Sequence, residues 1–212
     1  MDQPQPPKPP RQPPPPPPQP PLLAARDLKL RGDRFAPLSH ETMTPEQRAM
    51  TDAVLDGRRG SMQGPYNVML RSPAVGQLAQ AFGAQARFGS SLPLRLNELA
   101  ILVIAADWRC RFMAHAHRSI AIEAGLAEAV VDGVARGETP PGLQADETAV
   151  LQFCRELQAT REVGDATFAA VRDAFGERGV FDLIATLGYY TLVAMSLNVD
   201  RYPLPEVKPP AS

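Results

Sequence analysis

A glutamate, a thiol and two of the three histidines of this 212-residue chain lie close together, within residues 94–125. Positions i, i+3 and i+7 share one face of a helix, and Cys110, Met113 and His117 have this spacing. His115 points well away from that face. The spacing therefore selects His117, rather than His115, as the partner of Cys110.

The helix that carries this face is expected to begin near Arg109, which places Cys110 in its first turn. The helix dipole there favours a negatively charged thiolate, the reactive form of cysteine. Ala114 lies on the same face and leaves room for a ligand, and Trp108 and Tyr189 are further candidates for a pocket wall. A single cysteine at a helix start is also often a small buried residue without chemistry, so both roles of Cys110 stay open.

Glu98 precedes a run of apolar residues on a helix expected from Leu92-Pro93 to about Asp107. A buried carboxylate must find a polar partner or take up a proton. A glutamate and a histidine that meet in an apolar pocket form a proton-transfer pair suited to neutral pH. Glu98 could equally compensate the helix dipole, and His117 could be a structural histidine, so the residues alone leave these alternatives open.

Metal, cofactor and nucleic-acid chemistry are not expected. His115 and His117 are two positions apart and diverge on a helix, and the ligand spacing of a zinc site is absent from the sequence. The sequence at residues 57–60 lacks the lysine and serine or threonine of a phosphate-binding loop. A net charge of −1 does not resemble the basic footprint of a nucleic-acid binder.

Helix signals follow one another along the chain without a credible strand between them. The segment Thr44-Pro45-Glu46-Gln47 combines a capping threonine, a first-turn proline and a glutamine three residues after the cap. Further helix starts are expected at Pro65, Ser72, Leu92, Arg109, Ala127, Asp146, Asp165 and Val180. The helix from Ser72 carries apolar residues on one face at Val75, Leu78, Ala79, Phe82 and Ala86. Cys154 lies on an apolar helix face and is assigned to the core.

Thirteen of the 24 prolines fall in residues 1–21, which we expect to form a disordered polyproline tail. A passive spacer is preferred over recruitment of a partner, because the tract has no flanking specificity pattern. Residues 22–43 are assigned to a connector, residues 44–205 to one helical domain and residues 206–212 to a disordered tail. With two cysteines, no signal peptide and no apolar run long enough to span a bilayer, we expect a cytoplasmic protein without membrane contact.

The order of Glu98, Cys110, Met113 and His117 resembles the alkylhydroperoxidase D-like motif, in which a glutamate precedes Cys-x-x-Cys-x-x-x-His at the same intervals. The flanking LRLNELAILVIA and AIEAGL, and the later FGERGVFDLIATLGYYTLVAMSLN, resemble the wider carboxymuconolactone decarboxylase family. The resemblance covers roughly residues 44–205. It implies an all-α, single-domain bundle of about eight helices that assembles as a homo-oligomer, as a trimer or a hexamer.

The resemblance implies two kinds of chemistry. Peroxidase-type relatives use both motif cysteines, but Met113 replaces the second one, and a thioether cannot form a disulfide. Decarboxylase-type relatives instead need a general acid, a cation for the substrate carboxylate and an apolar pocket. Glu98 and His117 match the family's acid and base positions. The cation candidates are Arg71, Arg95, Arg109, Arg111 and Arg118.

We therefore expect an enzyme that uses Glu98 and His117 in acid–base chemistry on a small organic acid or lactone, with Cys110 as a pocket wall or supporting donor. One alternative is a thiol peroxidase, an oxidoreductase of the peroxiredoxin type, in which Cys110 works with an external thiol. The other alternative is a non-catalytic helical scaffold that recruits a partner through its proline-rich tail.

Overall fold

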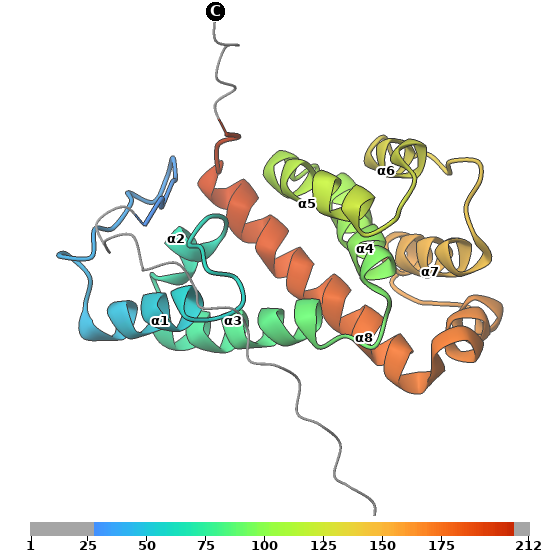
Figure 1. Ribbon diagram of the computed structural model, residues 1–212, viewed down its shortest axis with the longest axis horizontal. Coiled ribbons are helices and arrows are strands. Elements are labelled where there is room, and N and C mark those ends of the chain that lie inside the picture. Colours follow the sequence, from blue (N-terminus) through green and yellow to red (C-terminus); the bar gives the residue numbers. More distant parts are fainter. Residues whose placement is uncertain (1–27, 206–212) are drawn as a thin grey trace, which may run out of the picture.

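The computed structural model describes residues 28–205 of the chain. In this part, the regular elements are all helices, joined by loops (Figure 1). In order, its eight helices are α1 (Pro45–Leu55), α2 (Tyr66–Met69), α3 (Pro73–Phe88), α4 (Leu94–Asp107), α5 (Arg111–Glu123), α6 (Glu128–Ala135), α7 (Ala145–Thr160) and α8 (Asp165–Asp200). The predicted all-α bundle is therefore confirmed. The tails expected over residues 1–21 and 206–212 lie outside the described residues.

Most helix ends follow from local sequence signals. Thr44 and Gln47 form the expected capping box: the Thr44 hydroxyl accepts the Gln47 N–H at 3.3 Å, and the Gln47 side chain accepts the Thr44 N–H at 2.9 Å. Ser72 precedes α3 but makes no capping hydrogen bond. α8 contains the two helices that were expected separately, joined across Gly176, whose φ of 69° and ψ of 175° are not helical.

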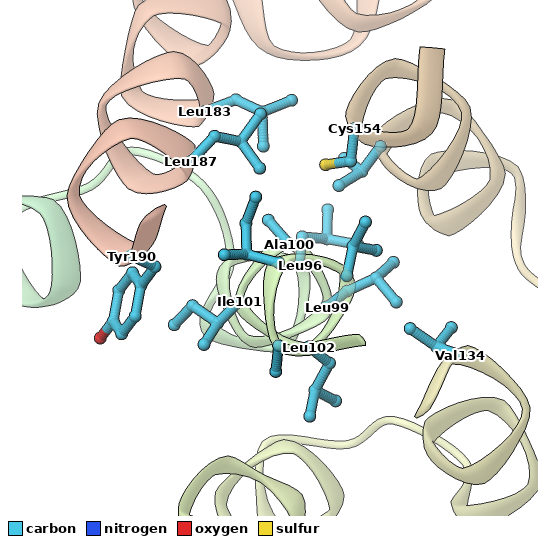
Figure 2. Packing of buried hydrophobic residues seen from close by; sticks show 14 of the residues in the cluster. Leu96, Leu99, Ala100, Ile101, Leu102, Val134, Cys154, Leu183, Leu187 and Tyr190 are labelled. Atoms are coloured by element: carbon cyan, nitrogen blue, oxygen red, sulfur yellow. The ribbon is translucent and has the colours of Figure 1, made fainter. Parts of the chain in front are cut away.

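Helix α4 is the centre of the larger core. Every residue from Leu96 to Ala105 is buried, and the helix packs against α5, α6, α7 and α8. Figure 2 shows the side chains of Leu99, Ile101 and Leu102 leaving α4 in different directions, each toward other apolar groups. A helix that is apolar on all sides belongs in a core, so the sequence of α4 determines its place.

The segment before α1 is anchored to the far end of α8. The Oδ1 atom of Asp200 accepts the backbone N–H groups of Arg34 at 3.0 Å and Phe35 at 2.8 Å. Leu28 and Met43 are buried with residues of α1 and α2 in a second, smaller core. The described part of the connector therefore wraps on the domain. Helix α2 packs against α8, and α1 packs along α3 (Figure 1).

Three large apolar side chains of helix α3 are exposed, while two of its glycines are buried. Val75, Leu78 and Phe82 are exposed, whereas Gly76 and Gly83 are buried. The two glycines face the fold because their neighbours come too close for a side chain: a Cβ on Gly83 would lie 2.0 Å from Cζ of Tyr189. Three large apolar residues of α3 are thus left on the surface, although Ala86 of the same stripe is buried.

A second exposed apolar stripe runs along α8. Phe181, Ile184, Leu192, Met195 and Val199 are all exposed. By length and composition α8 could cross a bilayer, but half of its most apolar 18-residue stretch is buried inside the fold. The same test is passed by core helices of water-soluble proteins, so the exposed stripe alone does not place the chain in a membrane.

Candidate active site

Glu98 and His117 meet at the contact between α4 and α5. Nδ1 of His117 lies 2.6 Å from Oε2 of Glu98, and both side chains are buried. Glu98 comes from the second turn of α4 and is completely shielded from solvent, while His117 is 8% exposed. The packing of α4 on α5 therefore joins two residues that are 19 positions apart in the chain.

The contact with Glu98 determines which ring nitrogen of His117 remains available to a ligand. Because Glu98 binds Nδ1, the other ring nitrogen of His117, Nε2, is left without a hydrogen bond to any described residue. The second carboxylate oxygen of Glu98, Oε1, has no hydrogen-bond partner there either, and its nearest cation is Nε of Arg87 at 4.0 Å. A carboxylate that holds one imidazole nitrogen fixes the orientation of the ring.

His117 lines a cavity of about 210 Å³ between α3, α5, α8 and the loop before α2. Other residues of its wall are Arg59, Tyr66, Arg87, Met113, Tyr189 and Tyr190. Tyr190 stands edge-on to His117, with the ring centroids 5.2 Å apart. In Figure 2, Tyr190 lies at the edge of the apolar cluster, and its hydroxyl points away from Ile101.

The cations of this cavity are Arg59 and Arg87, and neither was among the candidates from the sequence. Nη2 of Arg59 donates to the hydroxyl of Tyr189 at 3.2 Å. Arg59 lies in the loop after α1, where the sequence was interpreted only as a helix break. In the sequence Arg59 is marked only by its neighbour Arg58, which makes an arginine pair. In the structure Arg58 is exposed and Arg59 is partly buried.

The five arginines proposed from the sequence lie elsewhere. Arg95 pairs with Asp146 and Glu147, and Arg118 pairs with Glu128 and Asp132. Arg71 binds the backbone oxygen of Ala36. Arg109 and Arg111 line a different hollow, beside the end of α8. None of the five borders the cavity that contains His117.

Cys110 is separated from this cavity. It is the residue before α5 rather than part of its first turn, it is 1% exposed, and it borders the hollow that contains Arg109 and Arg111. Burial raises the pKa of the Cys110 thiol, and the backbone N–H of Met113 offsets this only in part. The expected stabilisation of a thiolate by the helix start is thus outweighed by desolvation.

Of the remaining residues proposed as pocket wall, two line the cavity with His117 and two lie outside it. Met113 and Tyr189 line the cavity with His117, whereas Trp108 and Ala114 do not. Trp108 is the capping residue after α4, and its indole Nε1 is buried without a hydrogen-bond partner. Ala114 packs against the larger core.

No disulfide joins the second cysteine, Cys154, to Cys110. Cys154 and Cys110 are both free thiols. Cys154 is fully buried on α7, where burial raises the pKa of its thiol, and it faces the α4 core in Figure 2. Within residues 28–205, no three histidine, cysteine, aspartate or glutamate side chains are grouped to hold a metal ion.

The fold is that of the alkylhydroperoxidase D-like helical proteins. It matches the alkylhydroperoxidase AhpD core of an uncharacterized peroxidase-related protein from Ralstonia eutropha, with a TM-score of 0.67, 19% identity and coverage of 82% of this chain and 92% of that one. An uncharacterized peroxidase-related protein from Silicibacter matches with a TM-score of 0.62, 14% identity and coverage of 82% and 94%. A protein of unknown function from Agrobacterium tumefaciens matches with a TM-score of 0.60, 18% identity and coverage of 66% and 97%.

Residues 73–156 match the model of the carboxymuconolactone decarboxylase family. This segment is similar to that family, in agreement with the resemblance seen in the sequence. The matched segment contains Glu98, Cys110 and His117, whereas Arg59, Tyr66 and the tyrosines of α8 lie outside it. No curated protein matches the chain in sequence.

Proposed function

We propose that the protein is an enzyme that uses Glu98 and His117 for proton transfer on a small organic acid or lactone. The observation that carries this proposal is the 2.6 Å contact between Glu98 Oε2 and His117 Nδ1 at the wall of a cavity. A buried glutamate that orients a histidine toward a ligand site is a typical general acid–base arrangement.

In this proposal, Nε2 of His117 exchanges the proton with the substrate. When a carboxylated substrate loses carbon dioxide, the electron pair of the broken bond remains on the substrate as an enolate. Protonated His117 donates its Nε2 proton to the enolate carbon, and solvent then restores the proton on the ring. Glu98 stabilises the charged imidazole throughout, and Arg59 and Arg87 offset the negative charge of the substrate.

Thiol peroxidase chemistry has less support. The Cys110 thiol is buried, its pKa is raised, and it does not border the cavity with His117. Met113 stands where the motif of the peroxidase-type relatives has its second cysteine. A non-catalytic scaffold would not explain why unpaired polar groups line the cavity.

The test compares turnover of a lactone and β-keto acid panel by the wild type, Glu98→Gln, His117→Ala and Cys110→Ser. We expect the first two substitutions to lower kcat by about 10²- to 10⁴-fold and Cys110→Ser to leave most of the activity. His115→Ala is the matched control, because His115 is exposed on the same helix. Loss of turnover in Cys110→Ser with retention in His117→Ala would contradict the assignment.

A further inference from the structure

Unpaired polar atoms are concentrated at the cavity that contains His117. Arg59 Nε, the Tyr66 hydroxyl and the Tyr190 hydroxyl are buried, belong to its wall and have no hydrogen-bond partner among the described residues. A buried polar atom left unpaired is unfavourable, and native proteins leave few of them. Their convergence on one cavity indicates a polar ligand.

The charges of the cavity indicate the sign of that ligand. Arg59 and Arg87 are the cations of its wall, and the wall contains no aspartate or glutamate. The nearest carboxylate, Glu98, lies behind His117 and is 4.0 Å from Arg87. No ion pair joins Arg59 to any carboxylate within residues 28–205, so one positive charge is not compensated there. An isolated buried charge is costly, and an anionic ligand would neutralise it.

The tyrosines supply neutral donors beside this charge. Burial raises the pKa of both Tyr66 and Tyr190, so their hydroxyls stay protonated at neutral pH. Burial of Arg59 acts to lower the pKa of the guanidinium, but Tyr189, Tyr66 and the neighbouring Tyr190 hydroxyl together raise it. Tyr189 accepts a hydrogen bond from Arg59 and holds the guanidinium in place. A protonated hydroxyl next to a guanidinium can donate to the same oxygen of an anion.

We propose that the cavity binds the carboxylate of a small monoanionic organic acid through the Arg59 guanidinium and the hydroxyls of Tyr66 and Tyr190. The rest of the ligand lies against the apolar part of the wall, which includes Met113, Ile120 and Val193. One guanidinium flanked by neutral hydroxyl donors matches the single charge of a carboxylate better than a phosphate group, which carries about −1.5 to −2 at neutral pH. This inference rests on the proposed function in that both place the ligand in one cavity.

The test measures equilibrium binding by titration calorimetry, with benzoate as the probe and benzamide as its neutral counterpart of the same shape. We expect benzoate to bind the wild type and benzamide to bind at least about tenfold more weakly. Arg59→Gln should weaken benzoate about ten- to hundredfold and leave benzamide unchanged, whereas Arg59→Lys should recover part of the loss. Arg58→Gln is the matched control, because exposed Arg58 stacks on Phe88 outside the cavity.

Tyr190→Phe separates ligand binding from structural support. The substitution removes a hydroxyl that has no protein partner, so the melting temperature should stay the same or rise while benzoate binds several-fold more weakly. A benzoate affinity that is unchanged in both Arg59→Gln and Tyr190→Phe overturns the proposal. Equal affinity for benzamide, tighter binding of inorganic phosphate, or no binding of benzoate, acetate and butyrate at about 10 mM overturns it as well.

The two proposals can fail separately. If Glu98→Gln and His117→Ala retain turnover while Arg59→Gln loses benzoate, the carboxylate site stands and the acid–base function is wrong. If the first two variants lose turnover while Arg59→Gln binds benzoate normally, the function stands and the carboxylate is bound elsewhere.

Discussion

Gly83 of α3 and Tyr189 of α8 are packed so closely that a methyl group on residue 83 would lie 2.0 Å from the tyrosine ring. This approach brings α3 against α8 and fixes the ring whose hydroxyl accepts a hydrogen bond from Arg59. The same ring stands edge-on to Tyr190, with 5.2 Å between centroids. Gly83, which lies outside the Glu98–His117 pair, thus helps to position Arg59, one of the two cations of the cavity.

We predict that Gly83→Ala destabilises the protein, because the added methyl group must displace Tyr189 or the α3 backbone. Overpacking of a core typically costs about 1–3 kcal/mol, which corresponds to a fall of roughly 2–4 °C in Tm for each kcal/mol in a domain of this size. Thermal unfolding followed by circular dichroism would measure it. Benzoate binding should weaken too, because Tyr189 no longer holds Arg59.

Gly188→Ala is the control for this prediction. A Cβ on Gly188 meets nothing within 4 Å, and alanine is favoured over glycine inside a helix by up to about 1 kcal/mol. Gly188→Ala should therefore leave Tm unchanged or raise it in the protomer. Equal effects of the two substitutions would show that the close approach of Gly83 to Tyr189 is not what limits residue 83 to glycine.

We predict that Cys110 reacts slowly with iodoacetamide in the folded protein at neutral pH. Only the thiolate reacts, and the raised pKa of Cys110 lowers the thiolate fraction at any given pH. The labelling rate should rise as the pH is increased beyond the ordinary range of a cysteine thiol. Mass spectrometry of the labelled peptide would follow it, with the unfolded chain as the fast reference.

Labelling of native Cys110 as fast as in the unfolded chain, together with peroxide consumption that Cys110→Ser abolishes, would favour the thiol peroxidase alternative. Cys154 provides an internal comparison, because it is fully buried and its thiol pKa is also raised by burial. It should remain unlabelled under native conditions at every pH at which the fold is intact.

We predict that Asp146 contributes to stability at neutral pH and loses this contribution in acid. Burial acts to raise the pKa of Asp146, but the hydrogen bond and charge of Arg95 outweigh it, so the folded pKa lies below the ordinary value. The unfolded chain therefore binds a proton more readily than the folded one. The contribution is complete above the unfolded pKa and disappears as pH falls through the folded pKa.

Chemical unfolding between about pH 2 and pH 7 would measure this effect in the wild type and in Asp146→Asn. The substitution should lower stability at neutral pH and make the acid part of the profile less steep. In an Arg95→Gln background, Asp146→Asn should change the profile little, because the cation that lowers the pKa is gone. An unchanged acid profile in Asp146→Asn alone would contradict the prediction.

The sequence by itself determined the features that depend on neighbours along the chain. The capping box of Thr44 and Gln47 and the apolar character of α4 were predicted because helix signals repeat within a few residues. Most helix starts were placed within two residues of their observed positions. Glu98 and His117 were selected by motif spacing, and Cys154 was assigned correctly to the core.

Tertiary structure alone decided which of these residues meet. The contact between Glu98 and His117 requires α4 to pack on α5, and residue spacing within one helix cannot specify how two helices pack. Which residues of α3 are buried depends on a ring from α8, so the spacing of Val75 and Leu78 could not show that both stay exposed. Arg59 lies in a loop, where no periodicity marks a residue that folds inward. Its role as the cation of the cavity became visible only because α8 brings Tyr189 to it.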